Sequence, residues 1–346
     1  MLAPDTDRQR AATLPSPYLL FLGDVTAPAY AKTAFGLKDW AGDRCVGELS
    51  LAGGTVKTGL SRLTPAEARL RGARALVVGV AVEGGRIAPA WVPALVDALD
   101  AGLDIVSGMH QRLAEVPALA TAAARTGRAL IDVRVPPTAI PVATGAKRSG
   151  KRLLTVGTDC ALGKKYTALA LAAAFTGRGV DADFRATGQT GIMIAGGGIP
   201  LDAVVSDFAA GAAEILSPVA APDHWDIIEG QGSLFHPSYA GVSLALLHGS
   251  QPDIFVVCHE PGRTRIMGLP DFTVPPIEAV IDLTLALGRL TNPQIRCGGV
   301  ALNTAHLTAE AAEALIATES ARLGLPVADP VRGGATFDAL VDACLQ

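Results

Sequence analysis

The sequence predicts an α/β protein of two domains, each built around a parallel, doubly wound sheet. Its 346 residues are roughly twice the ~150 of an average domain, which favours two domains. Hydrophobic residues make up 49% of the chain and aromatic residues only 5%, a composition typical of compact α/β proteins rich in small aliphatic side chains. Short apolar runs alternate with helical patterns, and this alternation predicts parallel strands joined by helices.

The first half contains four apolar runs of strand length. They lie at 18–23 (YLLFLG), 75–82, 104–108 and 129–135. A continuous apolar run bounded by turn residues is typical of a strand that is buried on both faces. Residues 90–102 have a helical pattern that ends at a glycine, as helices commonly do. These features predict a Rossmann-like parallel sheet domain.

The alternation breaks at 135–151, a stretch with three prolines and a basic tail that contains glycine and serine. We place the linker there and predict domains at 1–145 and 146–346. The second half resumes the pattern with apolar runs at 152–157, 225–230, 253–259 and 297–304, and with a helix over 308–324.

Composition and charge exclude several classes of function. The net charge is -4 without long runs of like charge, so we expect neither nucleic acid nor an anionic membrane as a partner. The five cysteines lie far apart and form no CxxC or Cys/His cluster, which argues against disulfides and structural zinc. The N-terminus lacks the apolar core of a signal peptide, and no apolar run reaches the ~18 residues of a membrane helix. We therefore expect a cytoplasmic protein that acts on a small-molecule substrate.

The segment TVGTDCALGKKYT, 155–167, carries the strongest functional signal. An apolar run precedes it and the helical pattern YTALALAAAF follows, which is the context of a phosphate-binding loop. In such a loop, backbone N–H groups and the positive end of the helix face one anion. Gly157 provides the turn, Gly163 allows close approach and Lys164 neutralises charge. We therefore predict a P-loop NTPase-like fold for the C-terminal domain, although five residues rather than four separate the two glycines.

Lys165 departs from the form of this loop that hydrolyses ATP. The position after the loop lysine usually holds a hydroxyl side chain that binds Mg²⁺. A lysine cannot ligate a cation, and Thr167 lies two positions too late to replace the hydroxyl simply. The sequence therefore favours a loop that binds phosphates over one that hydrolyses ATP.

Polar residues follow three further apolar runs, at the strand ends where open α/β sheets bind ligands. They are Glu229, His259 and Asn303, which could converge with Gly157. For Glu229 the alternative is a helix cap or an ordinary ion-paired carboxylate, and for Asn303 it is a turn residue that closes its strand.

The stretch 227–263 holds the densest set of polar candidates, namely Gln231, Ser233, His236, His248, His259 and Arg263. A neutral histidine is a fair general base, and arginine binds carboxylates through two N–H groups. Each histidine could instead satisfy a core carbonyl or cap a helix. Ser233 lacks the GxSxG context of a nucleophile, and the histidines lack an HxxxH spacing, so we predict no metal ligand. A glycine-rich turn is expected at TGQTG, 187–191, and Lys32 follows the first strand.

Together these segments resemble a bacterial two-domain P-loop family, long regarded as uncharacterised, that includes D-glutamate N-acetyltransferases. The resemblance is carried by GTDCALGKKYTALAL, GQTGIMIAGGGI, IEGQGSLFHPSYAGVSLALLHGSQPD and VCHEPGR, and in the first half by KTAFGL, SGMH and IDVR. The C-terminal half also resembles dethiobiotin synthetase, in which GTDxxxGK is the phosphate loop. There a strand ending in VEGxGG carries a Mg²⁺-binding glutamate, matched by Glu229, and a strand ending in Asn reads the adenine, matched by Asn303.

The resemblance implies a cofactor that contains a nucleotide. The residues it assigns to that cofactor are Gly157, Thr158, Asp159, Cys160, Ala161, Leu162, Gly163, Lys164, Lys165, Tyr166 and Asn303. The implied cofactor is acetyl-CoA, because an adenine, a ribose 3′-phosphate and a pyrophosphate suit a phosphate loop with an extra lysine. ATP or ADP with Mg²⁺ is the alternative.

The implied activity is transfer of the acetyl group from acetyl-CoA to the amino group of D-glutamate. Direct attack by an amine needs a general base, for which we predict Glu229 or His236 without preference. The predicted substrate contacts are Lys32, Gln189, Gln231, Ser233 and Arg263. A homodimer is expected from the resemblance and from the prevalence of symmetric dimers. The alternatives are an ATP-dependent ligase or kinase of the dethiobiotin synthetase type, and a non-catalytic nucleotide-binding protein.

Overall fold

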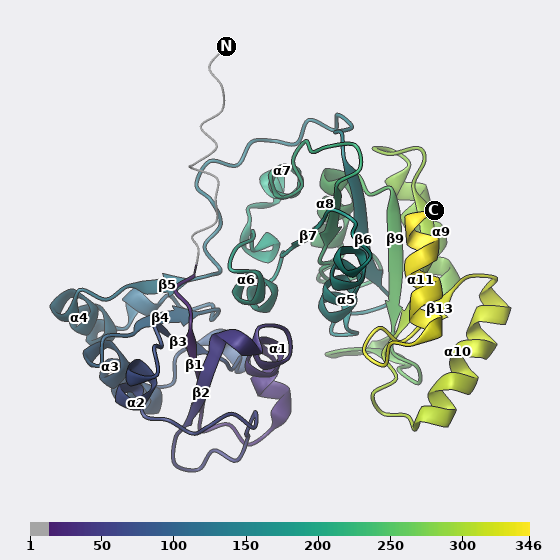
Figure 1. Cartoon of the computed structure of the whole chain (residues 1–346). Coiled ribbons are helices and arrows are strands. Elements are labelled where there is room, and N and C mark those ends of the chain that lie inside the picture. The colour runs from purple at the N-terminus through teal and green to yellow at the C-terminus, as the bar shows by residue number, and fades with distance from the viewer. Residues whose placement is uncertain (1–13) are drawn as a thin grey trace. The chain divides into compact units, whose positions relative to one another are not determined.

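The computed structural model describes residues 14–346, which form two compact units (Figure 1). The first unit holds residues 14–137 together with the later segment Gln189–Pro200. The second unit holds Thr138–Gly188 and Leu201–Gln346. The second half of the chain therefore contributes one short segment to the first unit.

The first unit contains a five-stranded, wholly parallel sheet with the order β2-β1-β3-β4-β5. Its strands are β1 (Tyr18–Gly23), β2 (Cys45–Ser50), β3 (Ala75–Val78), β4 (Asp104–Ser107) and β5 (Leu130–Asp132). Its helices are α1 (Lys32–Trp40), α2 (Pro65–Leu70), α3 (Val92–Asp100), α4 (Pro117–Thr126) and, from the later segment, α6 (Gln189–Ala195). Strands β1 and β3 are buried along their whole length, as expected of strands covered on both faces. The predicted Rossmann-like sheet is confirmed.

Two elements of this unit depart from the sequence-based expectation. The apolar run at 75–82 forms only β3, because the Gly79 carbonyl accepts the Ala34 amide at 2.8 Å and so serves helix α1. Strand β2 was not expected, since its sequence CVGELS includes a glycine and a glutamate. The buried Glu48 carboxylate is satisfied there by the Thr58 amide at 2.7 Å, so an acidic residue fits inside the sheet.

The second unit contains a six-stranded, wholly parallel sheet with the order β13-β12-β9-β6-β8-β7. Its strands are β6 (Lys151–Gly157), β7 (Ala182–Arg185), β8 (Trp225–Ile228), β9 (Ile254–His259), β12 (Arg296–Leu302) and β13 (Val327–Ala328). Its helices are α5 (Lys164–Gly177), α7 (Ser206–Leu216), α8 (Ala240–Ser250), α9 (Ile277–Gly288), α10 (Ala309–Leu323) and α11 (Ala335–Leu345). An antiparallel hairpin of β10 (Arg265–Ile266) and β11 (Leu269–Thr273) follows β9.

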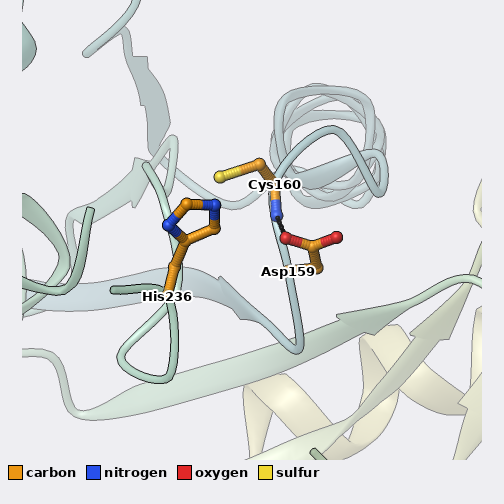
Figure 2. A group of neighbouring side chains, drawn as sticks. All are labelled: Asp159, Cys160 and His236. Carbon is orange, nitrogen blue, oxygen red and sulfur yellow. Dashed lines mark hydrogen bonds between the residues drawn. The ribbon is translucent and has the colours of Figure 1, made fainter. Parts of the chain in front are cut away.

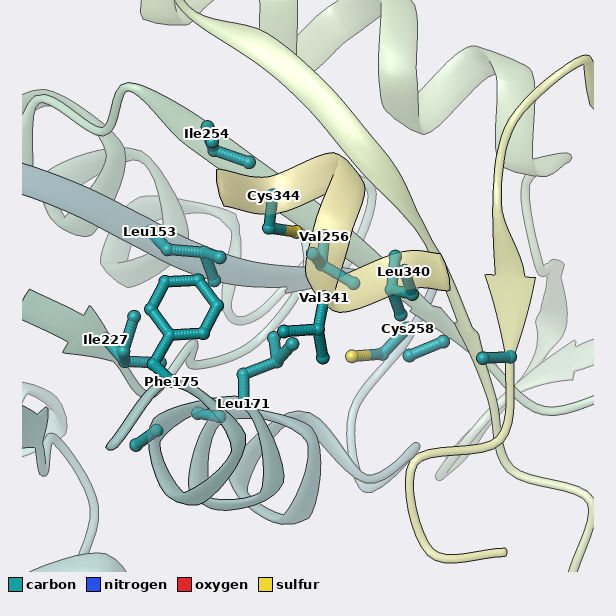
Figure 3. Close-up of a cluster of buried hydrophobic side chains, with 14 of the residues drawn as sticks. Leu153, Leu171, Phe175, Ile227, Ile254, Val256, Cys258, Leu340, Val341 and Cys344 are labelled. Atoms are coloured by element: carbon teal, nitrogen blue, oxygen red, sulfur yellow. The ribbon is translucent and has the colours of Figure 1, made fainter. Parts of the chain in front are cut away.

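An apolar cluster joins this sheet to helices α5 and α11 (Figure 3). Phe175 of α5 meets Trp225 of β8 edge to face, with 5.3 Å between the ring centroids, and Leu340 of α11 is fully buried in the same cluster. Leu154 of β6 lies on the other face, beside Leu246 of α8 and Val280 of α9. Because helices cover both faces, the sheet is doubly wound, as predicted.

Local sequence signals set the ends of helix α10 but fail for α6. The Thr308 hydroxyl accepts the Ala311 amide at 3.3 Å, and Gly324 closes α10 with a φ of +62°. The turn expected at TGQTG is wrong, because Gln189 begins helix α6. The Thr190 hydroxyl bonds to the Thr33 hydroxyl of α1 at 2.8 Å, so packing within the first unit overrides a weak local helix propensity.

The carboxyl ends of β6, β8, β9 and β12 all lie at one edge of the second sheet, because the strands are parallel neighbours. The residues at or directly after these ends are Gly157, Glu229, His259 and Asn303. This edge therefore gathers the strand-end residues that the sequence singled out. Across 14–346, none of the helices combines the length and the apolar character that crossing a bilayer requires.

Candidate active site

The phosphate loop connects β6 to α5 at this edge of the sheet. Ala161 has a φ of +54° and Gly163 a φ of +108°, left-handed values that turn the chain sharply into the helix. Among the residues that the structure describes, the amides of Ala161, Leu162 and Gly163 meet no protein acceptor. The loop thus offers free backbone donors next to the positive end of a helix, which is the requirement for binding an anion.

Lys164 lies folded over the loop that precedes it. Its Nζ donates to the Asp159 carbonyl at 2.7 Å, and a Cβ built on Gly157 would lie 3.3 Å from that nitrogen. Only 6% of the residue is exposed, and burial lowers the pKa of the ammonium group because the charged form has lost its water. A bound anion would add to the negative charge that Asp159 already places near this buried cation.

Asp159 holds the loop together through both carboxylate oxygens. Oδ1 accepts the Cys160 amide at 2.6 Å, and Oδ2 accepts the Arg263 guanidinium at 3.1 Å and the Met267 amide at 2.9 Å. Arg263 also donates to the Cys160 carbonyl at 2.8 Å and to Glu260 at 2.5 Å. Asp159 was predicted to contact the cofactor and Arg263 the substrate. Their engagement with each other favours a role in positioning the loop.

Further hydrogen bonds fix the loop to the strands on either side of β6. Toward β9, the Thr158 hydroxyl bonds to His259 Nδ1 at 3.0 Å, and the Thr158 amide donates to the Cys258 carbonyl at 3.1 Å. Toward β8, the Gly230 amide donates to the Thr155 hydroxyl at 2.9 Å. The loop is therefore held at a defined place along the edge of the sheet.

The residues after Lys164 bear on the question of magnesium. The Thr167 hydroxyl lies 3.5 Å from the Cys258 thiol in the core, and the residue is only 4% exposed, so this hydroxyl does not face the loop. Lys165 places its Nζ 4.9 Å from the centroid of the Tyr166 ring, and its charge lowers the pKa of the Glu229 carboxyl. An ammonium group thus lies near the carboxylate that the likeness to dethiobiotin synthetase assigns to Mg²⁺.

Glu229 follows β8 and is almost enclosed, with 4% of the residue exposed. Its Oε2 accepts the Thr187 amide at 2.9 Å and the Gly188 amide at 3.0 Å. Burial raises the pKa of the carboxyl, and the two amides and the Lys165 charge oppose that rise without cancelling it. A carboxylate in this setting accepts a proton more readily than an exposed one.

Gln231 and Ser233 lie in the turn after Glu229. Gln231 Nε2 donates to the Thr187 hydroxyl at 3.0 Å, and the Gln231 carbonyl accepts the Ser243 hydroxyl at 2.7 Å. The Ser233 hydroxyl accepts the Phe235 amide at 3.2 Å and is 2% exposed. Ser233 therefore shapes the turn, and Gln231 is the more accessible of these two predicted substrate contacts.

His236 ends the same turn beside the phosphate loop. Side-chain atoms of His236, Cys160 and Asp159 lie within 4.8 Å of one another, a grouping that could be taken for a metal site (Figure 2). Both Asp159 oxygens are already engaged, however, and one of them is held by the Arg263 guanidinium. A metal cation there would lie close to a fixed positive charge, which disfavours its binding.

A cavity of about 600 Å³ lies next to the loop, at the ends of β9 and β12. His259, which bonds to Thr158 of the loop, forms part of its wall. The apolar part of the lining comprises Pro261, Pro276, Ile277, Leu302 and Leu315, and the charged part comprises Glu278, Glu319 and Arg322. The sequence did not indicate these side chains as ligand contacts, because they come from the end of β12, from loops and from helices α9 and α10, and share no motif.

Asn303 directly follows Leu302 of the cavity wall. Its Oδ1 accepts the Ala305 amide at 3.3 Å, which is the turn-closing role left open on sequence grounds. Because Asn303 follows a residue that lines the cavity, a contact with the adenine of the cofactor stays a prediction.

Lys32 and Gln189 belong to the first unit, where each begins a helix, α1 and α6 respectively. These helices pack together, as the bond between Thr33 and Thr190 shows. A Cβ built on Gly108 would lie 1.9 Å from Gln189 Oε1, so the glutamine amide rests against the end of β4. The structure thus places two predicted substrate contacts that are far apart in sequence at the starts of two neighbouring helices.

Comparison with known proteins supplies the family. Residues 48–136 match a domain described as DUF1611_N, a Rossmann-like domain of unknown function, and residues 141–341 match DUF1611_C, a P-loop domain of unknown function. A D-glutamate N-acetyltransferase from Tritonibacter scottomollicae is 52% identical over 328 residues, which are 95% of this chain and 98% of that protein. A D-glutamate N-acetyltransferase from Pseudoalteromonas sp is 48% identical over 318 residues, which are 92% and 96% of the two chains.

The crystal structure of a DUF1611 family protein from Anabaena variabilis ATCC 29413 matches with a TM-score of 0.86 at 37% identity, covering 96% of this chain and 99% of the other. The family matches confirm the predicted pairing of a Rossmann-like domain with a P-loop domain. They also confirm the resemblance inferred from the motifs. The chain belongs to the two-domain DUF1611 family.

Proposed function

We propose that this chain transfers the acetyl group of acetyl-CoA to the amino group of D-glutamate. Two relatives named D-glutamate N-acetyltransferase are 52% and 48% identical to it over more than nine tenths of its length. The observation in the structure that best supports the proposal is a phosphate loop with free amide donors and two successive lysines, adjoining a cavity of nucleoside size.

Coenzyme A fits the chemistry of the loop and the cavity. Its pyrophosphate is an anion of the kind that the Ala161–Gly163 amides and Lys164 would bind. The cavity of about 600 Å³ is within the range of small-molecule sites, and its apolar walls suit an adenine ring. Because His259 contacts both regions, one molecule can place its phosphates in the loop and its base in the cavity.

Attack by an amine on the thioester needs a group that removes the amine proton. Glu229 meets this need because it is buried, is fixed by two backbone amides, and has a raised pKa. The Gly230 amide, which follows Glu229, already donates to the Thr155 hydroxyl and is therefore not free to bind the substrate. The contact of Gln231 with the substrate stays a prediction. The same holds for Lys32 and Gln189, which belong to the first unit. No covalent enzyme intermediate is needed for this reaction.

The observations at Lys165 and Thr167 favour acetyl transfer over an ATP-dependent ligase or kinase. An ammonium group replaces the hydroxyl that could hold Mg²⁺, and the Thr167 hydroxyl, two positions later, faces the core. The negative charge of phosphates bound in this loop is therefore neutralised by lysine side chains in place of Mg²⁺. The enclosed Glu229 carboxylate, with its raised pKa, favours an enzyme over a protein that only binds a nucleotide.

Identification of the product tests the proposal. Purified protein would be mixed with acetyl-CoA and either D- or L-glutamate, and the amino acid analysed by mass spectrometry. We expect N-acetyl-D-glutamate to accumulate far faster than the L-product. Absence of acetylated product with either isomer, from protein that binds CoA, would contradict the proposal.

A further inference from the structure

The His236 imidazole is buried with one nitrogen satisfied and the other unpaired. Nδ1 accepts the Ser238 amide at 3.1 Å. Nε2 is buried and has no hydrogen-bond partner among the residues that the structure describes, and the residue as a whole is 2% exposed. Buried polar side-chain atoms are normally hydrogen-bonded, so an unpaired ring nitrogen at this place calls for a ligand.

The bond to Nδ1 fixes which nitrogen carries the proton. A backbone N–H can only donate, so Nδ1 must be the acceptor in the bond from Ser238. A neutral imidazole that accepts at one nitrogen carries its proton on the other. Nε2 of His236 is therefore an N–H donor, and it has no lone pair with which to remove a proton from an amine.

The surrounding turn holds the ring in this orientation. The His236 amide donates to the Ser233 carbonyl at 3.0 Å, and the Tyr239 ring lies against the imidazole with 4.5 Å between centroids. Figure 2 shows the ring nitrogen farther from the side-chain attachment, Nε2, turned toward Cys160 and the start of the phosphate loop, while the other nitrogen is turned away. The donor thus points at the loop.

We infer that His236 is a ligand-binding donor whose Nε2–H bonds to a phosphoryl oxygen of the anion held by the phosphate loop. The inference rests on the proposed function for the identity of that anion, the pyrophosphate of CoA. It replaces the predicted role of His236 as a general base and leaves Glu229 as the base. The loop amides of Ala161–Gly163, Lys164 and His236 then form one set of donors around a single anion.

The charges near the ring agree with an anionic ligand. The only carboxylate in the group around His236, that of Asp159, is neutralised by Arg263 and has both oxygens occupied. Cys160 contributes only a thiol, whose pKa is raised mainly by burial, so it stays uncharged near neutral pH. Within this group of described residues a phosphoryl oxygen therefore meets donors and no unpaired negative charge.

Binding measurements with chosen substitutions test the inference. CoA and, separately, ADP would be titrated into the protein in the presence of a metal chelator, with calorimetric readout. His236→Leu removes the donor, and we expect it to raise the Kd of both ligands by about 10- to 100-fold, the range for a hydrogen bond to a charged group. In His236→Gln the side-chain amide reaches the position of Nε2, so this variant should keep the Kd within about threefold of the wild type, a small part of that range.

Control variants separate this role from a structural one. His248 of α8 bonds to the Leu287 carbonyl at 3.2 Å, away from the loop, and His248→Leu should leave both Kd values unchanged. His236→Asn gives a second test if His236→Leu fails to fold. The asparagine amide reaches only as far as the position of Nδ1, so this variant should bind both ligands as weakly as one without the donor. Thermal melting of each variant reports on folding.

Three results would overturn the inference. One is wild-type affinity in folded His236→Leu or His236→Asn, and another is a lowered kcat with unchanged Kd values, which would place His236 in the chemical step. The third is a wild-type protein that binds neither ligand. Binding of ADP but not of CoA would refute the proposed cofactor alone, because the His236 variants would still be judged on ADP.

Discussion

Glu229 is the residue on which the proposed chemistry depends most. Replacing it with glutamine keeps the shape of the side chain and removes the proton acceptor. We expect Glu229→Gln to lower kcat by about 10²- to 10⁴-fold, the usual contribution of a general base, with little change in the Kd of CoA. Steady-state kinetics and calorimetry together measure both quantities.

The pH dependence of kcat provides a sharper test of the same residue. The base works as a carboxylate, so kcat should fall as the pH drops through the pKa of Glu229. Because burial raises that pKa, the fall should begin at a higher pH than the ~4.3 of an exposed glutamate would give. This fall of kcat at low pH should be absent in Glu229→Gln. It should be kept in Glu313→Gln, which changes an exposed residue of α10. An unchanged profile in Glu229→Gln would assign the base elsewhere.

At the residue scale the sequence indicated positions better than roles. Glu229 could be predicted because it follows an apolar run, at the place where parallel strands present their ligands. The pairing of Arg263 with Asp159 could not, because the two residues are far apart along the chain and only the fold brings them within 3.1 Å. The role of His236 depended on the Ser238 amide, a local contact that no composition or spacing reveals.

The backbone of β6, just before the phosphate loop, is in close contact with the turn after β8. The Gly230 amide donates to the Thr155 hydroxyl, and a Cβ on Gly230 would lie 1.6 Å from the Thr155 carbonyl oxygen. The backbones of β6 and of the β8 turn therefore approach too closely for any side chain. This contact carries Glu229 and Gln231 to the side of the loop.

Substituting this glycine should separate the two segments. We expect Gly230→Ala to lower the free energy of unfolding by about 3 kcal/mol or more, because backbone must move to admit the methyl group. Urea unfolding measures the change. Gly241, at the start of α8, is exposed and has open space around its Cα, so Gly241→Ala should be neutral or stabilising by up to about 1 kcal/mol. Equal stability of both variants would contradict this account of the turn.

Elements with strong local signals were predicted well, and elements set by packing were not. The strands at the centre of both sheets were predicted from continuous apolar runs, and α10 from the helical pattern over 308–324. Helix α6 lies in a glycine-rich segment whose local preference is for turns, and it forms where it packs on α1 of the first unit. Strand β2 contains the buried Glu48, whose carboxylate is satisfied by the Thr58 amide, and the sequence alone does not reveal this hydrogen bond.

At the scale of the whole molecule, the second half of the chain contributes Gln189–Pro200 to the first unit. The chain leaves the second unit directly after Gly188, whose amide binds Glu229. A composition-based division of the sequence into two blocks cannot detect such an exchange, because it depends on contacts between segments that are distant in sequence.

A homodimer stays a prediction for the assembled protein. Light scattering after size-exclusion chromatography should give a mass of about twice the 35.4 kDa of one chain, as expected for the commonest symmetry among soluble oligomers. A mass that stays at the value for one chain over a wide concentration range would rule out the dimer.

Metal-independent release of CoA thiol is the decisive property of an acetyltransferase that holds its cofactor with lysines. Protein, acetyl-CoA and D-glutamate would be mixed with a thiol reagent in the presence of a chelator, with L-glutamate and Mg²⁺–ATP in parallel reactions. We expect thiol release that requires the D-isomer and survives chelation, because lysines rather than Mg²⁺ balance the phosphate charge. No thiol release, with ADP formed from Mg²⁺–ATP instead, would contradict it and make the loop one that hydrolyses ATP.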